Sequence, residues 1–491
     1  MQVAVLTIDV QSNQELTVYL EAGNKGIKGQ LPLFSQLQFD YQNWQNAINQ
    51  SATSQFRLES EETTEQLTVN IEPLAKKLED NINNWLQHEY FQNIREELID
   101  FLGASKTFPS RIVIKTDDLF LQQLPWYCWN VLKKFPNNEI TLSFKTGTIR
   151  SNSVFPRKSQ IKLLAILGTS SHISINEDIK ILKTIDSKTK IKIEYFPNKN
   201  SSQLQGNLKQ ILLNIIESNG YDILFFTGHG VGISNNQTDI IRIGTSTSTV
   251  DISLSELENA LQIAIKKGLR LAIFNSCFGM KIGQTLIRQH GLTTISMREK
   301  IKDNVAIDFL QNFLENFYLG MPLFLAVKEA RKQNLEVSDT WLPVIFQNEN
   351  AESIKLSDWK LPNILEVLLS VGLTGFNLGL MTISFAGTLL INQNFWLIIL
   401  ILSGIISALL FIFYPNFSQK KYLLAISILA LIINVSLIFI FKYGLSLLFF
   451  ALIPSLISVF IISLFCLIYY PLSKSLRFTG RFIKNVIQAI R

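Results

Sequence analysis

Cysteine and histidine are scarce in this chain, which holds three cysteines and four histidines among its 491 residues. Cys128, Cys277 and Cys466 lie far apart in the sequence. Because no two of them show a paired spacing, a disulfide framework and a zinc site are excluded, and a reducing compartment is expected. The histidines are scattered as well, so we expect neither a metal nor another cofactor.

A signal peptide and, over most of the chain, an excess of charge are also missing. The first residues show no basic start followed by a long apolar core, so we expect no signal peptide. Eight of the 45 basic residues but only one of the 39 acidic residues, Glu366, lie in residues 361–491. The net charge of +6 therefore belongs to that part, and the residues before it are almost neutral. Since they contain no basic stripe with interleaved aromatic side chains, we expect no nucleic-acid binding.

A long apolar tract occupies residues 361–470. Each of its four runs has about 20 apolar residues, the length of a helix that crosses a hydrocarbon core of roughly 30 Å. We expect four transmembrane helices, near residues 366–390, 395–414, 422–441 and 446–470. The basic tail at 471–491 has apolar residues at helical spacing, which is typical of an anchor at the anionic inner leaflet.

The basic residues around these spans predict their orientation. Lys420 and Lys421 lie between the second and third spans, the tail holds five basic residues, and the loop between the first and second spans holds none. The positive-inside rule then places both termini, and the domains before the spans, in the cytoplasm of a multi-pass membrane protein. Because the spans contain almost no ionisable residue at depth, a transporter is not favoured.

Residues 1–147 predict a small α+β domain. MQVAVLTIDV and ELTVYLEAG form an opening hairpin, NIEPLAKKLEDNINNWLQHEYFQNIREELIDFL is helical, and strands follow at 111–116 and 139–144. The segment 148–160 is polar, contains a proline and shows no periodicity, so we expect a linker there.

Residues 161–350 alternate between apolar strands and amphipathic helices. This pattern is typical of a mainly parallel sheet with helices on both faces, and hence of an α/β fold. The expected strands are 161–168, 192–196, 222–228, 271–276, 293–297 and 341–346. One helix opens with Ser253 and Glu256 at the spacing of a capping box and ends at Gly268.

Two of these strands run directly into a reactive side chain. His229 follows the strand at 222–228, and Cys277 follows the strand at 271–276. Right-handed crossovers make parallel strands point the same way, so both side chains are expected at one edge of the sheet. On neighbouring strands, about 4.8 Å apart, the imidazole and the thiol would come within working distance. The imidazole would then raise the thiolate fraction, or take the thiol proton during attack on a carbonyl.

Glycines surround the histidine. Gly228 and Gly230 flank it, so that the backbone could approach a substrate closely. The backbone N–H groups of Gly230 and Cys277 are the candidates for an oxyanion hole. Asp222 precedes the strand and is predicted to be a cap or turn residue, so no third catalytic residue is identified.

The order of these motifs resembles the CHAT family of bacterial caspase-like domains. The resemblance rests on FFTGHG, LAIFNSC, the Met-Arg-Glu at 297–299, LAVKEAR at 325–331 and WLPVIFQN at 341–348. It implies a caspase-like fold and a cysteine endopeptidase with a His229–Cys277 dyad. Two features depart from the family. Phe278 stands where relatives commonly have an acidic residue, and membrane helices replace the family's helical-repeat partner region.

The sequence therefore predicts a caspase-like cysteine endopeptidase, tethered to the inner face of a membrane, that cleaves a protein substrate. A second interpretation is a catalytically inactive scaffold or sensor that recruits a protein partner to the membrane. Phe278 and the missing third residue favour it. In a third, the membrane bundle itself forms a pore or senses the bilayer, although the lack of charge inside the spans argues against a pore.

Overall fold

The fold is described from a computed structural model. The described residues are 2–11, 16–50, 70–104, 109–147, 160–168, 175–188, 191–197, 208–228, 230–231, 240–244, 249–277, 279–332, 336–351 and 354–359. The predicted transmembrane spans and basic tail, and nearly all of the predicted linker, lie outside them. Among the described helices, none combines the length and the apolar character that crossing a membrane would need.

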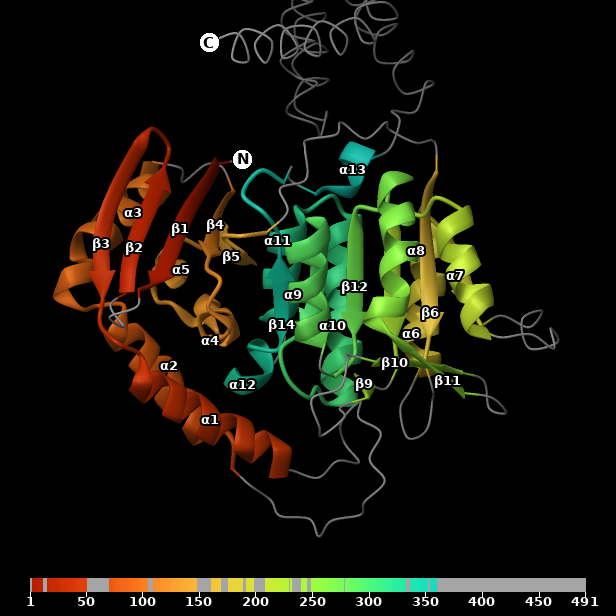
Figure 1. The fold of residues 1–491 in the computed structure, drawn as a ribbon, viewed down its shortest axis with the longest axis horizontal. Helices are drawn as coiled ribbons and strands as arrows, with labels where there is room; N and C mark the ends of the chain where they lie inside the picture. The colour runs from red at the N-terminus through yellow and green to blue at the C-terminus, as the bar shows by residue number, and fades with distance from the viewer. Residues whose placement is uncertain are drawn as a thin grey trace, which may run out of the picture. The chain divides into compact units, whose positions relative to one another are not determined.

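An 11-stranded sheet runs through the described residues (Figure 1). In spatial order its strands are β3 (Lys25–Leu31), β2 (Leu16–Ala22), β1 (Gln2–Val10), β4 (Ser110–Lys115), β5 (Asn138–Ser143), β14 (Pro343–Phe346), β13 (Thr293–Met297), β12 (Leu271–Asn275), β8 (Ile223–Thr227), β6 (Ile161–Leu167) and β7 (Ile191–Phe196). Three neighbouring pairs are antiparallel, namely β1–β2, β2–β3 and β13–β14, and the other pairs are parallel. The prediction of a mainly parallel sheet is confirmed.

A second, three-stranded sheet lies near the ends of β12 and β6 (Figure 1), and an isolated bridge joins Gly168, after β6, to Ile243. Its strands are β9 (Gly230–Val231), β10 (Ile240–Gly244) and β11 (Thr249–Ser253). The helices of the described residues are α1 (Ser35–Gln50), α2 (Glu72–Trp85), η2 (Glu89–Phe91), α3 (Gln92–Ala104), α4 (Leu119–Gln123), η3 (Trp126–Cys128), α5 (Val131–Lys134), α6 (Ile175–Lys188), α7 (Leu208–Ser218), α8 (Leu254–Lys266), α9 (Gly279–His290), α10 (Asp303–Tyr318), α11 (Leu323–Arg331), α12 (Val337–Thr340) and α13 (Leu356–Trp359).

The central strands are buried on both faces. Every residue of β8 and β12 is buried, and alternate residues face two different hydrophobic clusters. In β12, Ile273 belongs to the cluster that includes α6 and α10, and Phe274 belongs to the cluster that includes α7 and α8. Strands covered in this way read as uninterrupted apolar runs, which is why LAIFN and ILFFT stand out in the sequence.

The start of helix α8 also agrees with the prediction from the sequence. The Ser253 hydroxyl accepts the N–H of Glu256, and the Glu256 carboxylate accepts the N–H of Ser253 at 2.9 Å. This reciprocal pair confirms the predicted capping box at the start of α8.

The main sheet continues across the predicted linker. β5 precedes residues 148–160 and β14 follows them, yet the two strands pair in parallel through Phe346 and Leu142. Accordingly, Met1–Leu361 is one compact unit, and the boundary predicted at 148–160 does not divide the sheet. Periodicity identifies single strands but carries no information on which strands pair, so this continuity was not visible in the sequence.

Two helical features differ from the expectation. The single helix predicted between 70 and 102 is interrupted after Trp85, and the short helix η2 lies between α2 and α3. A further helix, α1, was not predicted at all. It is rich in Gln and Asn, and its few apolar side chains pack inward except for Phe39.

Candidate functional site

The two strands predicted to carry the dyad are neighbours in the sheet. β8 and β12 run parallel, and their register pairs Thr227 with Asn275. His229 and Cys277 therefore each come two positions after this pair. Cys277 belongs to the described residues, whereas His229 lies outside them.

The end of β8 is pressed against the end of β6. The N–H of Gly168 donates to the carbonyl of Thr227 at 2.7 Å. Gly228 has a φ of 150°, and a Cβ on it would lie 2.6 Å from the Cα of Gly168. From the sequence, Gly228 was expected to let the backbone approach a substrate closely. The structure gives a different reason, because it is the backbone of Gly168 that approaches.

The residues on both sides of position 229 are held by backbone pairing. Before it, Thr227 belongs to the main sheet, and its hydroxyl donates to the carboxylate of Asp178, which is fully buried in the first turn of α6. After it, Gly230 pairs with Ile241 in the three-stranded sheet. Neither Asp178 nor Gly168 was singled out in the sequence, since both act through residues about 50 positions or more away.

Cys277 lies between the end of β12 and the start of α9, and 2% of it is exposed. Its Sγ accepts the backbone N–H of Ile301 at 3.3 Å, and the carbonyl oxygen of Ile301 lies 3.9 Å from Sγ. The N–H of Ile301 favours the charged form of the sulfur, whereas its carbonyl, as an acceptor, favours the neutral thiol.

Two glycines allow α9, the helix that follows Cys277, to pack closely against the sheet. A Cβ on Gly283 of α9 would lie 2.6 Å from the ring of Phe346, and a Cβ on Gly279 would lie 3.1 Å from Cβ of Ser296. α9 therefore lies directly on β13 and β14. This close packing fixes the turn that presents Cys277.

Ile301 is the last residue of a short segment that we call the 298–301 strip, Arg298–Ile301, which follows β13. All four of its residues are buried. The N–H of Arg298 donates to the carbonyl of Leu342 at 2.7 Å, and its Nε donates to the carbonyl of Trp341 at 3.1 Å. The strip is thus attached to the segment before β14 at one end and touches the thiol at the other.

Glu299 connects the strip to α1. Its Oε1 accepts the hydroxyl of Tyr41 and Nε2 of Gln45, each at 2.7 Å. Burial raises the pKa of the Glu299 carboxyl, while these hydrogen bonds and the neighbouring cations act in the opposite direction. Met-Arg-Glu at 297–299 stands out in the sequence, but the partners of Glu299 lie more than 250 residues earlier, where no local pattern points to them.

Lys300 is a cation of the strip whose charge interacts with Cys277. Burial lowers the pKa of Lys300, whereas the charges of Cys277 and Glu299 act to raise it. Its Nζ donates to the carbonyl of Asn49 at 3.4 Å. The side chain of Lys300 also lines a small hollow together with Lys302, Asp339 and four other residues.

Two residues considered in the sequence lie away from this edge. Asp222 stands at the opposite end of β8, where its carboxylate accepts the N–H of Lys162 at 3.0 Å, as expected for a cap or turn residue. Cys128 is buried in the core beside α2, and burial raises the pKa of its thiol. Among the described residues, no group of three or more His, Cys, Asp or Glu is arranged to hold a metal ion.

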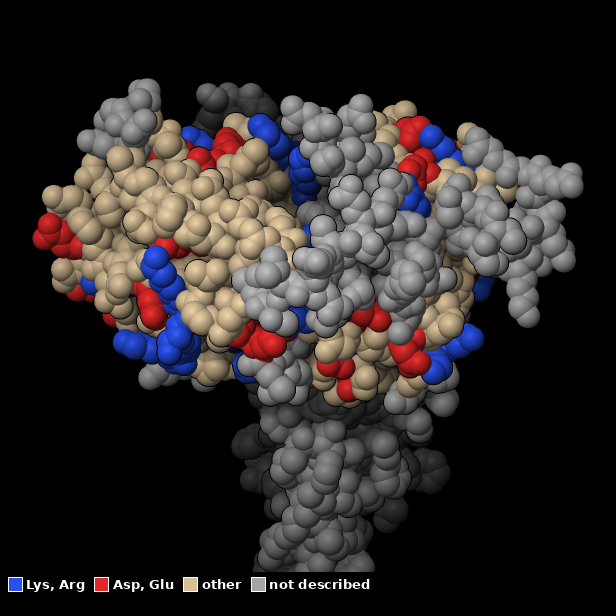
Figure 2. All heavy atoms as spheres, turned by 90° about the horizontal axis from the view of Figure 1, so that it is seen from below, with Lys and Arg blue, Asp and Glu red and all other residues tan. Residues whose placement is uncertain are grey.

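The face seen in Figure 2 carries charges of both signs, and its described Lys and Arg side chains lie among Asp and Glu side chains. Near the 298–301 strip, Nζ of Lys302 lies 3.4 Å from Oδ2 of Asp339.

A comparison with protein families finds a match over much of the described part of the chain. The model of the CHAT domain family matches residues 73–359, a stretch that includes β8, β12 and the 298–301 strip. Among curated proteins, none matches the chain.

Proposed function

Because this chain belongs to the CHAT domain family, we propose that it is a caspase-like cysteine endopeptidase in which Cys277 is the nucleophile and His229 moves the proton. The observation that carries this proposal is the register of β8 and β12. Thr227 is paired with Asn275, so the two reactive residues follow adjacent strand ends after the same number of steps. Adjacent strands lie about 4.8 Å apart, a distance that an imidazole and a thiol can bridge.

In the proposed reaction His229 first takes the thiol proton as Sγ of Cys277 attacks the carbonyl carbon of a peptide bond. The tetrahedral intermediate collapses as His229 gives its proton to the leaving amine, which leaves an acyl group on sulfur as a thioester. Water then adds to the thioester, His229 takes its proton, and the carboxylic acid and the thiol are released. The N–H groups of Gly230 and Cys277 are the proposed donors to the oxyanion.

The surroundings of the thiol support a nucleophilic role. The N–H of Ile301 donates to Sγ, and the charge of Lys300 acts on the same sulfur. Each of these two contacts favours the charged form of the sulfur, while the Ile301 carbonyl that accepts from Sγ favours the neutral thiol. At Cys128 burial is the largest influence and raises the pKa of the thiol, although the charges of Arg298 and Lys133 act to lower it.

The alternative is a catalytically inactive scaffold, and one observation favours it. Only 2% of Cys277 is exposed, so a substrate carbonyl would reach Sγ only after a rearrangement around it. Labelling by a thiol-directed peptide electrophile separates the two proposals. An enzyme should be labelled at Cys277 far faster than at Cys128, and a scaffold should show no such difference.

The decisive experiment compares cellular proteins with and without the thiol. Cleavage products that appear with the wild-type chain should be absent with Cys277→Ala and present with Cys128→Ala, which removes a buried thiol elsewhere. Products that persist in Cys277→Ala would refute the peptidase proposal. The products themselves would reveal the protein substrate.

We also propose that residues 361–491 hold the peptidase at the cytoplasmic face of a membrane. The support is the sequence: four apolar runs of spanning length, and basic residues on the loops assigned to the inside. The full chain should stay with the membrane pellet in alkaline carbonate, and the unit Met1–Leu361 should not. A protease added outside sealed cells should spare tags at both termini, and cleavage of either tag would contradict the orientation.

A further inference from the structure

α1 runs beside the 298–301 strip and contacts it with one face. Tyr41, Gln45 and Asn49 are spaced four residues apart, so they share one side of the helix. Tyr41 and Gln45 donate to Glu299, and the carbonyl of Asn49 accepts Nζ of Lys300.

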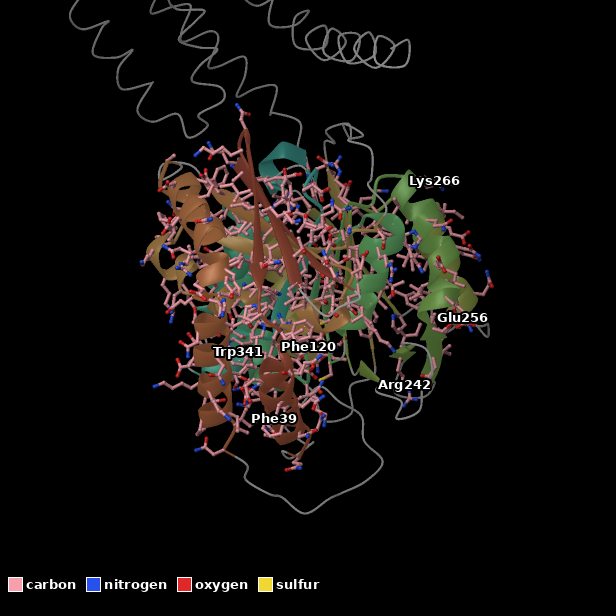
Figure 3. All side chains as sticks on the ribbon, turned by 60° about the vertical axis from the view of Figure 1, so that its left-hand side comes forward. Phe39, Phe120, Arg242, Glu256, Lys266 and Trp341 are labelled. Atoms are coloured by element: carbon pink, nitrogen blue, oxygen red, sulfur yellow. The ribbon has the colours of Figure 1, made fainter. Side chains whose placement is uncertain are left out.

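Aromatic packing fixes α1 in this place. The ring of Trp44 lies 5.2 Å from that of Trp341, and the ring of Tyr41 lies 5.9 Å from that of Phe120. Figure 3 labels Trp341 and Phe120, and also Phe39, which is 55% exposed. The face of α1 that carries Tyr41 and Trp44 therefore packs against Phe120 and Trp341 and also holds Glu299 of the strip.

The strip transmits this position to the nucleophile over two residues. Glu299 is held by α1, and Ile301 donates its N–H to Sγ of Cys277. Glu299, Lys300 and Ile301 are all buried, so the strip has little room to move independently. A shift of Glu299 would therefore displace the N–H that faces the thiol.

We propose that Tyr41 and Gln45 are positioning residues for the nucleophile: by holding Glu299, they keep the N–H of Ile301 on Sγ of Cys277. This inference rests on the proposed role of Cys277 as the nucleophile. α1 precedes the residues matched by the family model, which begin at 73. The catalytic centre of this chain thus includes a helix from outside the matched domain.

Several charged groups act on this arrangement besides the hydrogen bond. Lys300 acts on the thiol directly, and Glu299 and Arg298 lie on the same strip. On the β8 side His229 follows the strand, outside the described residues. The variants Tyr41→Phe and Gln45→Leu remove none of these groups, but the loss of the two donors raises the pKa of the Glu299 carboxyl. Glu299→Gln, which keeps an acceptor without the charge, separates this effect from a change in the position of the strip.

The test is the pH dependence of Cys277 alkylation in the full chain. Iodoacetamide is the probe, and mass spectrometry of the Cys277 peptide measures the rate, so no substrate is required. In the double variant Tyr41→Phe, Gln45→Leu the apparent pKa of the thiol should rise on the order of one unit, because a donor to the thiolate is displaced. Alkylation at pH 7 should accordingly slow about tenfold.

The control makes the same chemical changes away from the strip. Tyr90 is 60% exposed and Gln42 is exposed on α1, so Tyr90→Phe with Gln42→Leu should leave the profile unchanged. Glu299→Gln should also keep the wild-type profile, since an amide oxygen can accept both donors. Glu299→Ala, which removes the acceptor, should reproduce the shift.

The outcomes separate the two proposals. If Tyr41→Phe, Gln45→Leu keeps the wild-type melting temperature and the wild-type pH profile, the positioning role is overturned. A shift in Glu299→Gln as large as that in Glu299→Ala would also overturn it, because charge and not position would then be the cause. The peptidase proposal fails by a different result, namely cleavage that survives Cys277→Ala.

Discussion

The backbones of Gly168 and Gly228 are in direct contact at the carboxyl ends of β6 and β8, just before His229 in the chain. A Cβ on Gly228 would lie 2.6 Å from the Cα of Gly168, and a Cβ on Gly168 would lie 2.9 Å from the Cα of Gly228. Neither position has room for a side chain. The direction in which the chain leaves β8 is therefore set by this contact.

Gly228→Ala should reduce both stability and activity. The positive φ of 150° and the backbone clash should each cost about 1–3 kcal/mol of unfolding free energy. Displacing the chain before His229 should also lower the cleavage rate on the order of 100-fold. Urea unfolding and the cleavage rate measure the two effects.

A suitable control is Gly320→Ala. Gly320 also has a positive φ, of 90°, but no atom lies within 4 Å of its added Cβ. It should lose stability through backbone strain and keep its cleavage rate. Equal activity in the two variants would show that the Gly168–Gly228 contact does not orient the site.

Arg331→Met should destabilise the whole unit. Nη1 of Arg331 lies 3.0 Å from Oε2 of Glu139, and both side chains are buried. Removing the cation leaves a buried carboxylate without its partner, which costs about 3–5 kcal/mol. Lys332→Met is the matched control, because Lys332 pairs with Glu329 at the surface, where a pair contributes about 0–1 kcal/mol.

The same variant tests whether the described part unfolds as one. Glu139 belongs to β5 and Arg331 to α11, on opposite sides of the predicted linker. Because β5 and β14 share a sheet, urea should produce a single transition in the unit Met1–Leu361 that shifts as a whole in Arg331→Met. A separate, unshifted transition would indicate two independent domains.

Asp339 should make stability depend on pH below neutrality. Burial raises the pKa of its carboxyl from 3.8 to about 6, although Lys302 acts to lower it. A raised folded-state pKa means that the stabilisation is present below the unfolded value and is lost as pH rises through about 6. Relative to wild type, Asp339→Asn should therefore gain melting temperature between pH 4 and pH 7. Asp308→Asn, on the exposed side of α10, controls for the loss of a surface carboxylate. If the difference in melting temperature between Asp339→Asn and wild type did not change with pH, the raised pKa of Asp339 would be contradicted.

The central strands and the order of the two reactive residues were predictable, because both depend only on residues that are close together in the sequence. β8 and β12 are buried on both faces, so they appear in the sequence as apolar runs. Each run ends at a polar residue, Thr227 in β8 and Asn275 in β12. Right-handed crossovers then place the ends of these strands at the same edge of the sheet, but only the structure shows that β8 and β12 are neighbours. The capping box at Ser253 is local in the same sense, since its two members are three residues apart.

α1 and its contact with Glu299 were not predictable in this way. The inward residues Leu37, Tyr41, Trp44 and Ile48 do follow a helical spacing, and this was the one signal available. The residues between them are mostly Gln and Asn, which hide the pattern. The partner of Tyr41 lies 258 positions later, and no local rule connects residues at that separation.

A chain that begins at Pro73, where the family match begins, should not fold as the full chain does. It would lack β1, which pairs with β4 from Ser110 to Lys115, and α1, which holds Glu299. Ile112 and Ile114, now fully buried, would be exposed at a new sheet edge, so we expect aggregation or a loosely packed state that binds a hydrophobic dye. The unit Met1–Leu361 is the control and should melt cooperatively. The contrary result would be a chain from Pro73 that melts with the same cooperativity and whose Cys277 reacts at the wild-type rate. The N-terminal strands and α1 would then be dispensable, and the proposed positioning role of α1 would be refuted.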